Sequence, residues 1–142
     1  MNKISKLISL IVLIFSIQSN SFSKENFFEE AIKLYEKEKY EDARFLFERN
    51  IVFNPKDANS YLYLAKIYNH EEDQRKEEYN LETTLLIDPK NEEAIYNLAK
   101  LKLDTSDYKL SKELNDKLLN FCKKFCNRSE KLKIEIENLS KK

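Results

Sequence analysis

The sequence predicts an all-α protein built from stacked pairs of helices. Two prolines, Pro55 and Pro89, lie 34 residues apart, and each ends a run rich in aliphatic residues, just after Asn54 or Asp88. A spacing of 34 residues is a known period of helical repeats. The composition agrees with this, because 35% of the residues are charged, 2 are proline and 0 are glycine. Without glycine, tight turns that need a positive φ have few candidate residues.

The first 23 residues have the pattern of a removable export signal. Lys3 and Lys6 form a basic start, residues 7–17 form an apolar run, and small residues precede a cleavage point after Ser23. The apolar run is shorter than the roughly 18 residues that a spanning helix needs, so a permanent N-terminal membrane anchor is the alternative. The signal predicts a periplasmic or secreted protein with no stable membrane span after cleavage.

Residues 24–142 are expected to form one domain with a core of its own. The whole chain has a formal net charge of +0, and removal of Lys3 and Lys6 with the signal leaves a small excess of acidic residues. Such a balance excludes the basic footprint of a nucleic-acid-binding protein and a basic patch for a membrane surface.

Amphipathic patterns predict seven helices. Apolar residues recur at i, i+3 or i+4, and i+7, with Glu and Lys between them. Asp57 and Asn91 are expected N-caps, and Glu92 and Glu93 suit the first turn of a helix because they oppose its dipole. The expected helices run from Asn26 to Glu36, from Tyr40 to Phe53, from Asp57 to the turn at 70–73, from that turn to Asp88, from Asn91 to the break at 105–107, from Tyr108 to Cys122, and from 127–129 towards the C-terminus.

The last of these helices, at about 128–140, is predicted to be a C-terminal cap. Leu132, Ile136 and Leu139 fall on one face, and Lys and Glu fill the remainder. The end of a solenoid must cover its last apolar face while keeping a polar exterior, and this segment has the composition to do so. The alternative is a separate binding helix.

The pattern of large and small residues resembles that of the tetratricopeptide repeat proteins, which implies a right-handed α-solenoid of three helix pairs plus the capping helix. The second repeat carries Glu77 at a usually small position, and the third carries Asn115 at an aromatic position and Lys123 at the proline position, as expected of decay in a terminal repeat. The matching residues are Phe27, Ala31, Leu34, Tyr40, Ala43, Phe47 and Pro55 in repeat 24–57; Tyr61, Leu64, Ala65, Tyr68, Leu81 and Pro89 in repeat 58–91; and Ile95, Leu98, Ala99, Tyr108 and Ser111 in repeat 92–125.

The resemblance implies that the first helix of each pair lines a concave groove that binds a protein or peptide. Phe28, Ile32, Tyr35 and Leu62 are expected to form an exposed apolar patch that marks the partner site. The alternative is that a preceding segment or a second copy of the chain covers this patch. The predicted groove residues are Glu25, Phe28, Ile32, Tyr35, Asn59, Leu62, Lys66, Asn69, Glu93, Tyr96, Lys100 and Leu103.

The ligand of this groove is expected to be a helix or an extended peptide. Some members of the family hold the C-terminal carboxylate of chaperones with a clamp of Lys, Asn and Arg. The chain lacks this clamp, because the corresponding positions hold Phe28, Ile32, Tyr63, Glu93 and Asn97.

The sequence offers little for catalysis. His70 is its only histidine, and the absence of glycine rules out a glycine-rich phosphate loop. No catalytic residue, cofactor site or metal site is predicted. Cys122 and Cys126 are expected to form a structural disulfide, because export would place them where thiols oxidise. A redox pair and a metal site are the weaker alternatives, because the spacing is C-x3-C and further ligands are lacking.

The leading hypothesis is an exported adaptor that binds a partner through the concave groove and performs no chemistry. The alternative is a structural or self-assembling subunit of a cell-envelope assembly complex. A third hypothesis is a thiol-dependent enzyme that uses Cys122 and Cys126.

Overall fold

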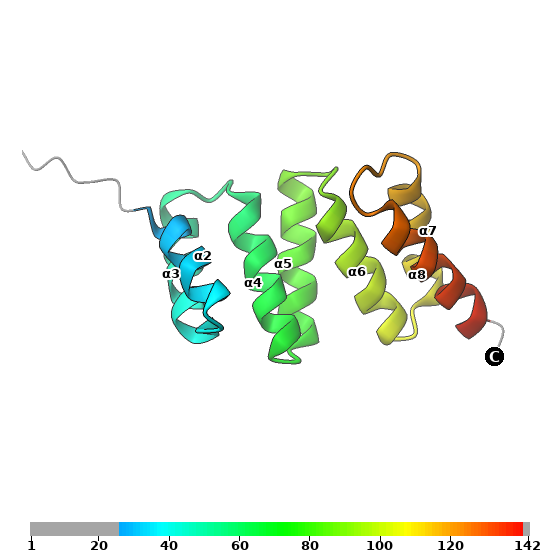
Figure 1. Cartoon of the computed structure of the whole chain (residues 1–142), viewed down its shortest axis with the longest axis horizontal. Coiled ribbons are helices and arrows are strands. Elements are labelled where there is room, and N and C mark those ends of the chain that lie inside the picture. Colours follow the sequence, from blue (N-terminus) through cyan, green and yellow to red (C-terminus); the bar gives the residue numbers. More distant parts are fainter. Residues whose placement is uncertain (1–25, 141–142) are drawn as a thin grey trace, which may run out of the picture.

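A computed structural model describes residues 26–140, all of whose regular elements are α-helices. Figure 1 shows three helix pairs side by side in a row, with α2 and α3 at one end and α8 at the other. This arrangement confirms the predicted all-α solenoid of three helix pairs with a C-terminal helix. The predicted signal at 1–23 and the predicted groove residue Glu25 lie outside the described residues. The helices are α2 (Phe27–Glu36), α3 (Tyr40–Phe53), α4 (Ala58–His70), α5 (Gln74–Ile87), α6 (Glu92–Asp104), α7 (Tyr108–Leu119) and α8 (Cys126–Leu139).

The predicted N-caps begin their helices. Asp57 precedes α4 and accepts a hydrogen bond from the backbone N–H of Asn59 at 3.2 Å. Asn91 precedes α6 and accepts one from the N–H of Ala94 at 3.0 Å. Each cap side chain accepts a hydrogen bond from a backbone N–H of the first turn, which has no acceptor within the helix. Local sequence therefore determines where the second and third helix pairs start.

Three clusters of buried side chains follow one another along the row. Ala31, Ala65 and Ala99, which are spaced 34 residues apart, are at most 1% exposed, and each lets neighbouring helices approach closely. Each cluster continues into the next helix pair or into α8, so the solenoid has a continuous core. The clusters are Ala31, Ala43, Phe47, Leu64, Ile67 and Tyr68; Leu62, Ala65, Leu81, Ala94, Leu98 and Leu101; and Ala99, Leu103, Leu132 and Ile136.

The turns inside the helix pairs use a left-handed backbone without glycine. Glu38, Glu72 and Ser106 have φ values of 58°, 58° and 65°. They are spaced 34 residues apart, and each lies between the two helices of a pair. A left-handed conformation costs an L-residue with a Cβ about 1–2 kcal/mol. The tight turns that glycine would favour are thus made by other residues, at an energetic cost.

Replacing Glu72 by glycine is expected to stabilise the fold by about 0.5–1 kcal/mol, since the relief of backbone strain exceeds the entropy that glycine loses on folding. Urea denaturation followed by circular dichroism measures the change. Glu72→Ala is the matched control, because alanine keeps the Cβ and should bring no gain. An equal gain for both variants would show that the charge of Glu72, and not its φ, is the cause.

The C-terminal helix is attached through a buried polar contact. Asn115 of α7 and Ser129 of α8 are 1% and 0% exposed. Asn115 Nδ2 donates to the carbonyl oxygen of Ser129 at 3.0 Å, and Ser129 Oγ donates to Asn115 Oδ1 at 2.5 Å. Asn115 at the aromatic position was expected to reflect decay of a terminal repeat. The structure instead gives it a specific role, since its side chain exchanges two hydrogen bonds with Ser129 and so attaches α8 to α7.

The loop between α7 and α8 is fixed by Glu92 at the start of α6. The Glu92 carboxylate accepts hydrogen bonds of 2.9, 2.8 and 3.0 Å from the backbone N–H groups of Lys123, Lys124 and Phe125. The bonds from Lys124, Phe125 and Lys123 lower the pKa of Glu92. A proline in place of Lys123 would have no N–H to donate, which explains the missing proline of the third repeat.

The predicted disulfide is present in this loop. Cys122 and Cys126 are bonded, with their Cα atoms 5.3 Å apart. Helix α7 ends at Leu119, so Cys122 lies in irregular chain, whereas Cys126 is the first residue of α8. The sequence predicts that this helix extends to Cys122, but α7 ends three residues earlier. The irregular chain after Leu119 lets the two cysteines come close enough to form the bond.

Candidate functional site

A pocket of about 350 Å³ opens between the first helices of the three pairs. Helices α2, α4 and α6 supply all of its lining except Glu77, which comes from α5. We call it the α4–α6 pocket, after the two helices that supply most of it. It is lined by Tyr35, Ala65, Lys66, Asn69, Glu77, Glu93, Tyr96, Asn97, Lys100, Leu101 and Asp104.

The structure brings half of the predicted groove residues together at this pocket. Tyr35 of α2, Lys66 and Asn69 of α4, and Glu93, Tyr96 and Lys100 of α6 all line it. Phe28, Ile32 and Asn59 do not. Asn59 is exposed beside the N-cap of α4, whereas Phe28 and Ile32 are half-buried against the first core cluster.

The prediction of an exposed patch formed by Phe28, Ile32, Tyr35 and Leu62 is wrong. Leu62 is only 5% exposed because it packs with Leu81 and Leu98 in the second cluster. The other three side chains are half-buried. The patch is therefore part of the solenoid's own packing.

Leu103 is also unavailable to a partner. It is 3% exposed, and Leu132 and Ile136 of α8 pack against it. Its place along α6 predicts a groove position, but α8 covers it. The C-terminal helix thus closes the predicted groove at this end.

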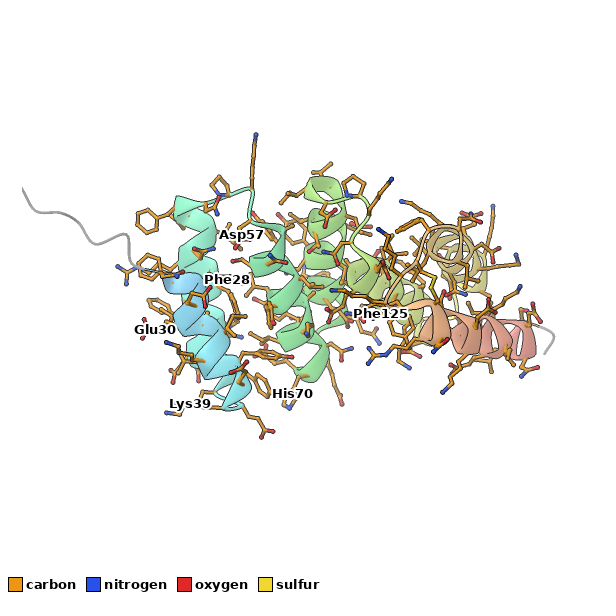
Figure 2. The ribbon with its side chains drawn as sticks, turned by 45° about the horizontal axis from the view of Figure 1, so that its top comes forward. Phe28, Glu30, Lys39, Asp57, His70 and Phe125 are labelled. Carbon is orange, nitrogen blue, oxygen red and sulfur yellow. A yellow bond between two sulfur atoms is a disulfide. The ribbon has the colours of Figure 1, made fainter. Side chains whose placement is uncertain are left out.

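Aromatic rings form a wall beside the pocket. The ring of Tyr63 lies 5.0 Å from Tyr35, 5.1 Å from Phe47 and 6.1 Å from Phe28, measured between centroids. Phe28 also meets Phe47 edge to face at 5.8 Å. Figure 2 shows Phe28 on the first helix pair, at the end of the solenoid. These mutual contacts explain why Phe28, Tyr35 and Tyr63 are half-buried, and they position Tyr35 at the rim.

An ion pair connects α4 and α6 across the pocket. Lys66 Nζ lies 2.9 Å from Glu93 Oε1 and 4.6 Å above the ring of Tyr63. Burial disfavours the charged form of Lys66, but the hydrogen bond and the charge of Glu93 outweigh it and raise the pKa. Lys66 therefore remains protonated, and its charge is matched by Glu93.

Glu77 is the least expected residue of the pocket. Its side chain stands where the repeat pattern has a small residue, and it is only 4% exposed. Asn69 Nδ2 donates to its two carboxylate oxygens at 3.1 and 3.2 Å. Burial raises the pKa of Glu77, the hydrogen bond from Asn69 lowers it, and the negative charge of Asp104 raises it further, so that the net shift is upward. In the sequence, Glu77 is noticeable only because it replaces the small residue of the repeat pattern, and this replacement does not indicate its role.

Glu77→Gln is expected to stabilise the protein by about 1 kcal/mol at pH 8, because it removes a buried charge and keeps an acceptor for Asn69. A carboxyl group whose folded pKa is raised contributes stability below its unfolded pKa, and this contribution is lost as pH rises through the folded pKa. The variant should therefore gain at pH 8 and show little change at pH 4 in urea denaturation. Glu82→Gln, an exposed change on the same helix, is the matched control. A loss of stability at pH 8 would contradict this account.

The other predicted residues lie away from the pocket. His70 is exposed at the end of α4 and its ring lies 4.4 Å from that of Tyr40, while Asp57 marks the opposite end of the helix (Figure 2). The disulfide lies in the loop between α7 and α8. Within 26–140, no helix combines the length and the apolar character needed to cross a membrane.

Comparisons with known proteins identify the fold. No protein-family model matches the sequence, and no curated protein matches it. Solved structures do match. The type III secretion chaperone SycD of Yersinia enterocolitica, in complex with a peptide of the translocator YopD, has a TM-score of 0.75 and 18% identity over 88% of this chain and 99% of its own. The first TPR domain of Spaghetti (RPAP3), bound to the HSP90 peptide SRMEEVD, has a TM-score of 0.74 and 12% identity over 82% and 91%.

A third match is the Sgt2 TPR domain from Aspergillus fumigatus, with a TM-score of 0.71 and 21% identity over 86% of this chain and 84% of the other. At such identities the likeness concerns the fold alone. The repeat pattern of the sequence, the three helix pairs and these structural matches agree, and the chain therefore has the fold of the tetratricopeptide repeat (TPR) proteins.

Proposed function

We propose that the protein is an exported adaptor that binds a peptide or protein segment in the α4–α6 pocket and performs no chemistry. The observation that carries this proposal is the pocket itself, which lies between the first helices and offers both aromatic and charged side chains. Seven of its eleven lining residues are polar or charged, and convergent polar groups of this kind orient a ligand in a binding site. Two proteins of the same fold, SycD and Spaghetti, have been solved with bound peptides, which supports the same use here.

Site-specific crosslinking tests this function. A photoreactive phenylalanine analogue replaces Lys100, which lines the pocket, or Lys109, which is exposed on α7 and serves as the control. Crosslinks to one partner segment from position 100 and not from position 109, identified by mass spectrometry, are the expected result. The same partner pattern from both positions, or none from position 100, would reject the pocket as the binding site.

The export part of the proposal rests on residues 1–23 and has its own test. In the source cell, the mature protein is expected in the envelope or medium, with Lys24 as its first residue by N-terminal sequencing. An uncleaved N-terminus in the membrane fraction would support the anchored alternative. An uncleaved protein in the cytoplasm would reject export.

The alternative function, a self-assembling subunit, is favoured by a second surface. Phe45 and Val52 of α3 are 61% and 76% exposed, and Tyr79 and Leu86 of α5 are 65% and 83% exposed. Within each helix the two residues are seven apart and share a face. The two rows are related by 34 residues, so they occupy equivalent positions on neighbouring repeats. Exposed apolar surfaces of this kind commonly mark association sites.

The occupant favoured by charge is a second copy of the chain. Glu41 and Arg75, both exposed, precede the two rows at equivalent positions with opposite signs. A symmetric dimer that places α3 of one copy on α5 of the other would pack the two apolar rows together. It would also place Glu41 of one copy near Arg75 of the other. Analytical ultracentrifugation should then show a dimer that Val52→Glu with Leu86→Glu disperses. Ile134→Glu, a change at an exposed apolar residue of α8, should leave the dimer intact. A monomer at all concentrations would exclude this alternative.

A further inference from the structure

The charges of the α4–α6 pocket are unevenly matched. Lys66 and Glu93 neutralise each other through their ion pair. Glu77 and Asp104 also line the pocket, and Lys100 is the remaining cation of the lining. Within residues 26–140, Lys100 forms no ion pair with either carboxylate. The part of the pocket around Glu77 and Asp104 therefore has an excess of negative charge.

Glu77 lacks the partner that a buried carboxylate usually has. Burial of an ionised carboxylate is unfavourable unless it is paired with a cation or fully hydrogen-bonded. The only donor to its side chain in the described part of the chain is Asn69, whose single amide nitrogen spans both oxygens. An ionised carboxylate has about four acceptor positions, so most of its capacity is unused. Asp104 adds a second negative charge near enough to act on Glu77.

We propose that the α4–α6 pocket recognises a cationic side chain, Lys or Arg, of the bound peptide, with Glu77 and Asp104 as its anionic partners. The inference rests on the proposed peptide-binding function and specifies its ligand. A guanidinium or ammonium group would supply the charge-assisted hydrogen bonds that Glu77 lacks. The buried position of Glu77, fixed by Asn69, keeps the carboxylate in place before the ligand arrives.

This chemistry differs from that of an acidic peptide such as SRMEEVD, the peptide bound to Spaghetti. Acidic ligands need free cations, and one of the two pocket lysines, Lys66, is already paired with Glu93. Lys100 alone opposes Glu77, Asp104 and any acidic ligand. The balance of charge in the pocket therefore favours a basic ligand.

Nuclear magnetic resonance titration of ¹⁵N-labelled protein at pH 8 tests the proposal. The probes are the N-acetyl, N-methylamide forms of arginine, lysine, norleucine and glutamate. Norleucine is the neutral counterpart of lysine with an apolar chain. The arginine and lysine probes should shift the Asn69 side-chain amide and the Glu77 backbone amide with dissociation constants of about 1–10 mM, the range expected for a single side chain.

Three variants separate charge recognition from folding. Glu77→Gln should weaken binding of the arginine probe at least about 10-fold, and Asp104→Asn by a smaller factor. Glu82→Gln, exposed on the same helix, should bind as the unmodified protein does. Because Glu77→Gln is expected to stabilise the fold, loss of binding in that variant would not reflect unfolding.

The outcomes distinguish this inference from the function on which it rests. Equal shifts by norleucine and lysine, preference for glutamate, or unweakened binding by Glu77→Gln would each overturn charge recognition, and the pocket would remain a peptide site of another specificity. Absence of saturable shifts with the arginine probe would overturn it as well. Failure of the crosslinking from position 100 would instead reject peptide binding in the pocket, whatever the probes show.

Discussion

Asn115→Ala is expected to destabilise the protein by about 2–4 kcal/mol. The side chain is 1% exposed, and its removal leaves a cavity and deletes two buried hydrogen bonds between Asn115 and Ser129. Urea denaturation measures the loss. Native-state hydrogen exchange should locate it, with amides of α8 exchanging faster than those of α4, since α8 depends on this contact.

Two further variants sharpen the test. Asn115→Phe restores the aromatic residue that the repeat pattern has at this position, yet it should also destabilise, because phenylalanine can form neither hydrogen bond to Ser129. Glu113→Ala, an exposed change on the same helix, should stay within about 0.5 kcal/mol of the original. If Asn115→Phe were as stable as the original protein, Asn115 would represent decay of a terminal repeat after all.

The helices could be predicted because their signals are local. Asp57, Asn91 and the two prolines lie within one turn of the helix ends that they determine. Apolar periodicity then identified buried residues such as Leu132 and Ile136, which are both 2% exposed. Each of these inferences depends on neighbours along the chain, where helix geometry fixes which residues share a face.

The contacts that complete the fold could not be predicted because they join distant segments. Glu92 accepts from amides 31 to 33 residues later, and Asn115 meets Ser129 at a separation of 14 residues. A sequence pattern shows Glu92 only as a favourable charge in a first turn. Burial of Leu103 depends on where α8 packs, which no spacing within α6 reveals. Glu77, Asn115 and Lys123 depart from the repeat pattern, but the pattern does not contain their partners Asn69, Ser129 and Glu92, which determine their roles.

The residues of the pocket also divide into those that local sequence predicts and those that it does not. Tyr35, Lys66 and Tyr96 line the pocket, as their positions in the first helices implied. Glu77 comes from a second helix and was therefore absent from the predicted set. Its charge is expected to lower stability at neutral pH, so stability does not explain it. Such local conflicts are expected at functional sites, which agrees with the proposed role of Glu77 in binding.

The largest effect is expected from Phe47→Ala, which should cost about 3–5 kcal/mol. Phe47 is 0% exposed, and its ring contacts both Tyr63 and Phe28. Phe45, two residues earlier on the same helix, is 61% exposed and gives a matched control of identical chemistry. Phe45→Ala should change stability by less than about 0.5 kcal/mol in the monomer. Urea denaturation of both variants at low protein concentration makes the comparison.

Phe47 also links stability to binding, because the ring of Tyr63 that it supports lies against Tyr35 at the rim of the α4–α6 pocket. Phe47→Leu keeps much of the buried apolar area but removes the stacked ring, so the fold should survive while the aromatic wall loosens. Binding of the arginine probe should then weaken with Glu77 still in place. Unchanged binding in a folded Phe47→Leu variant would show that the carboxylates act without the wall, whereas weaker binding would show that the core positions the pocket.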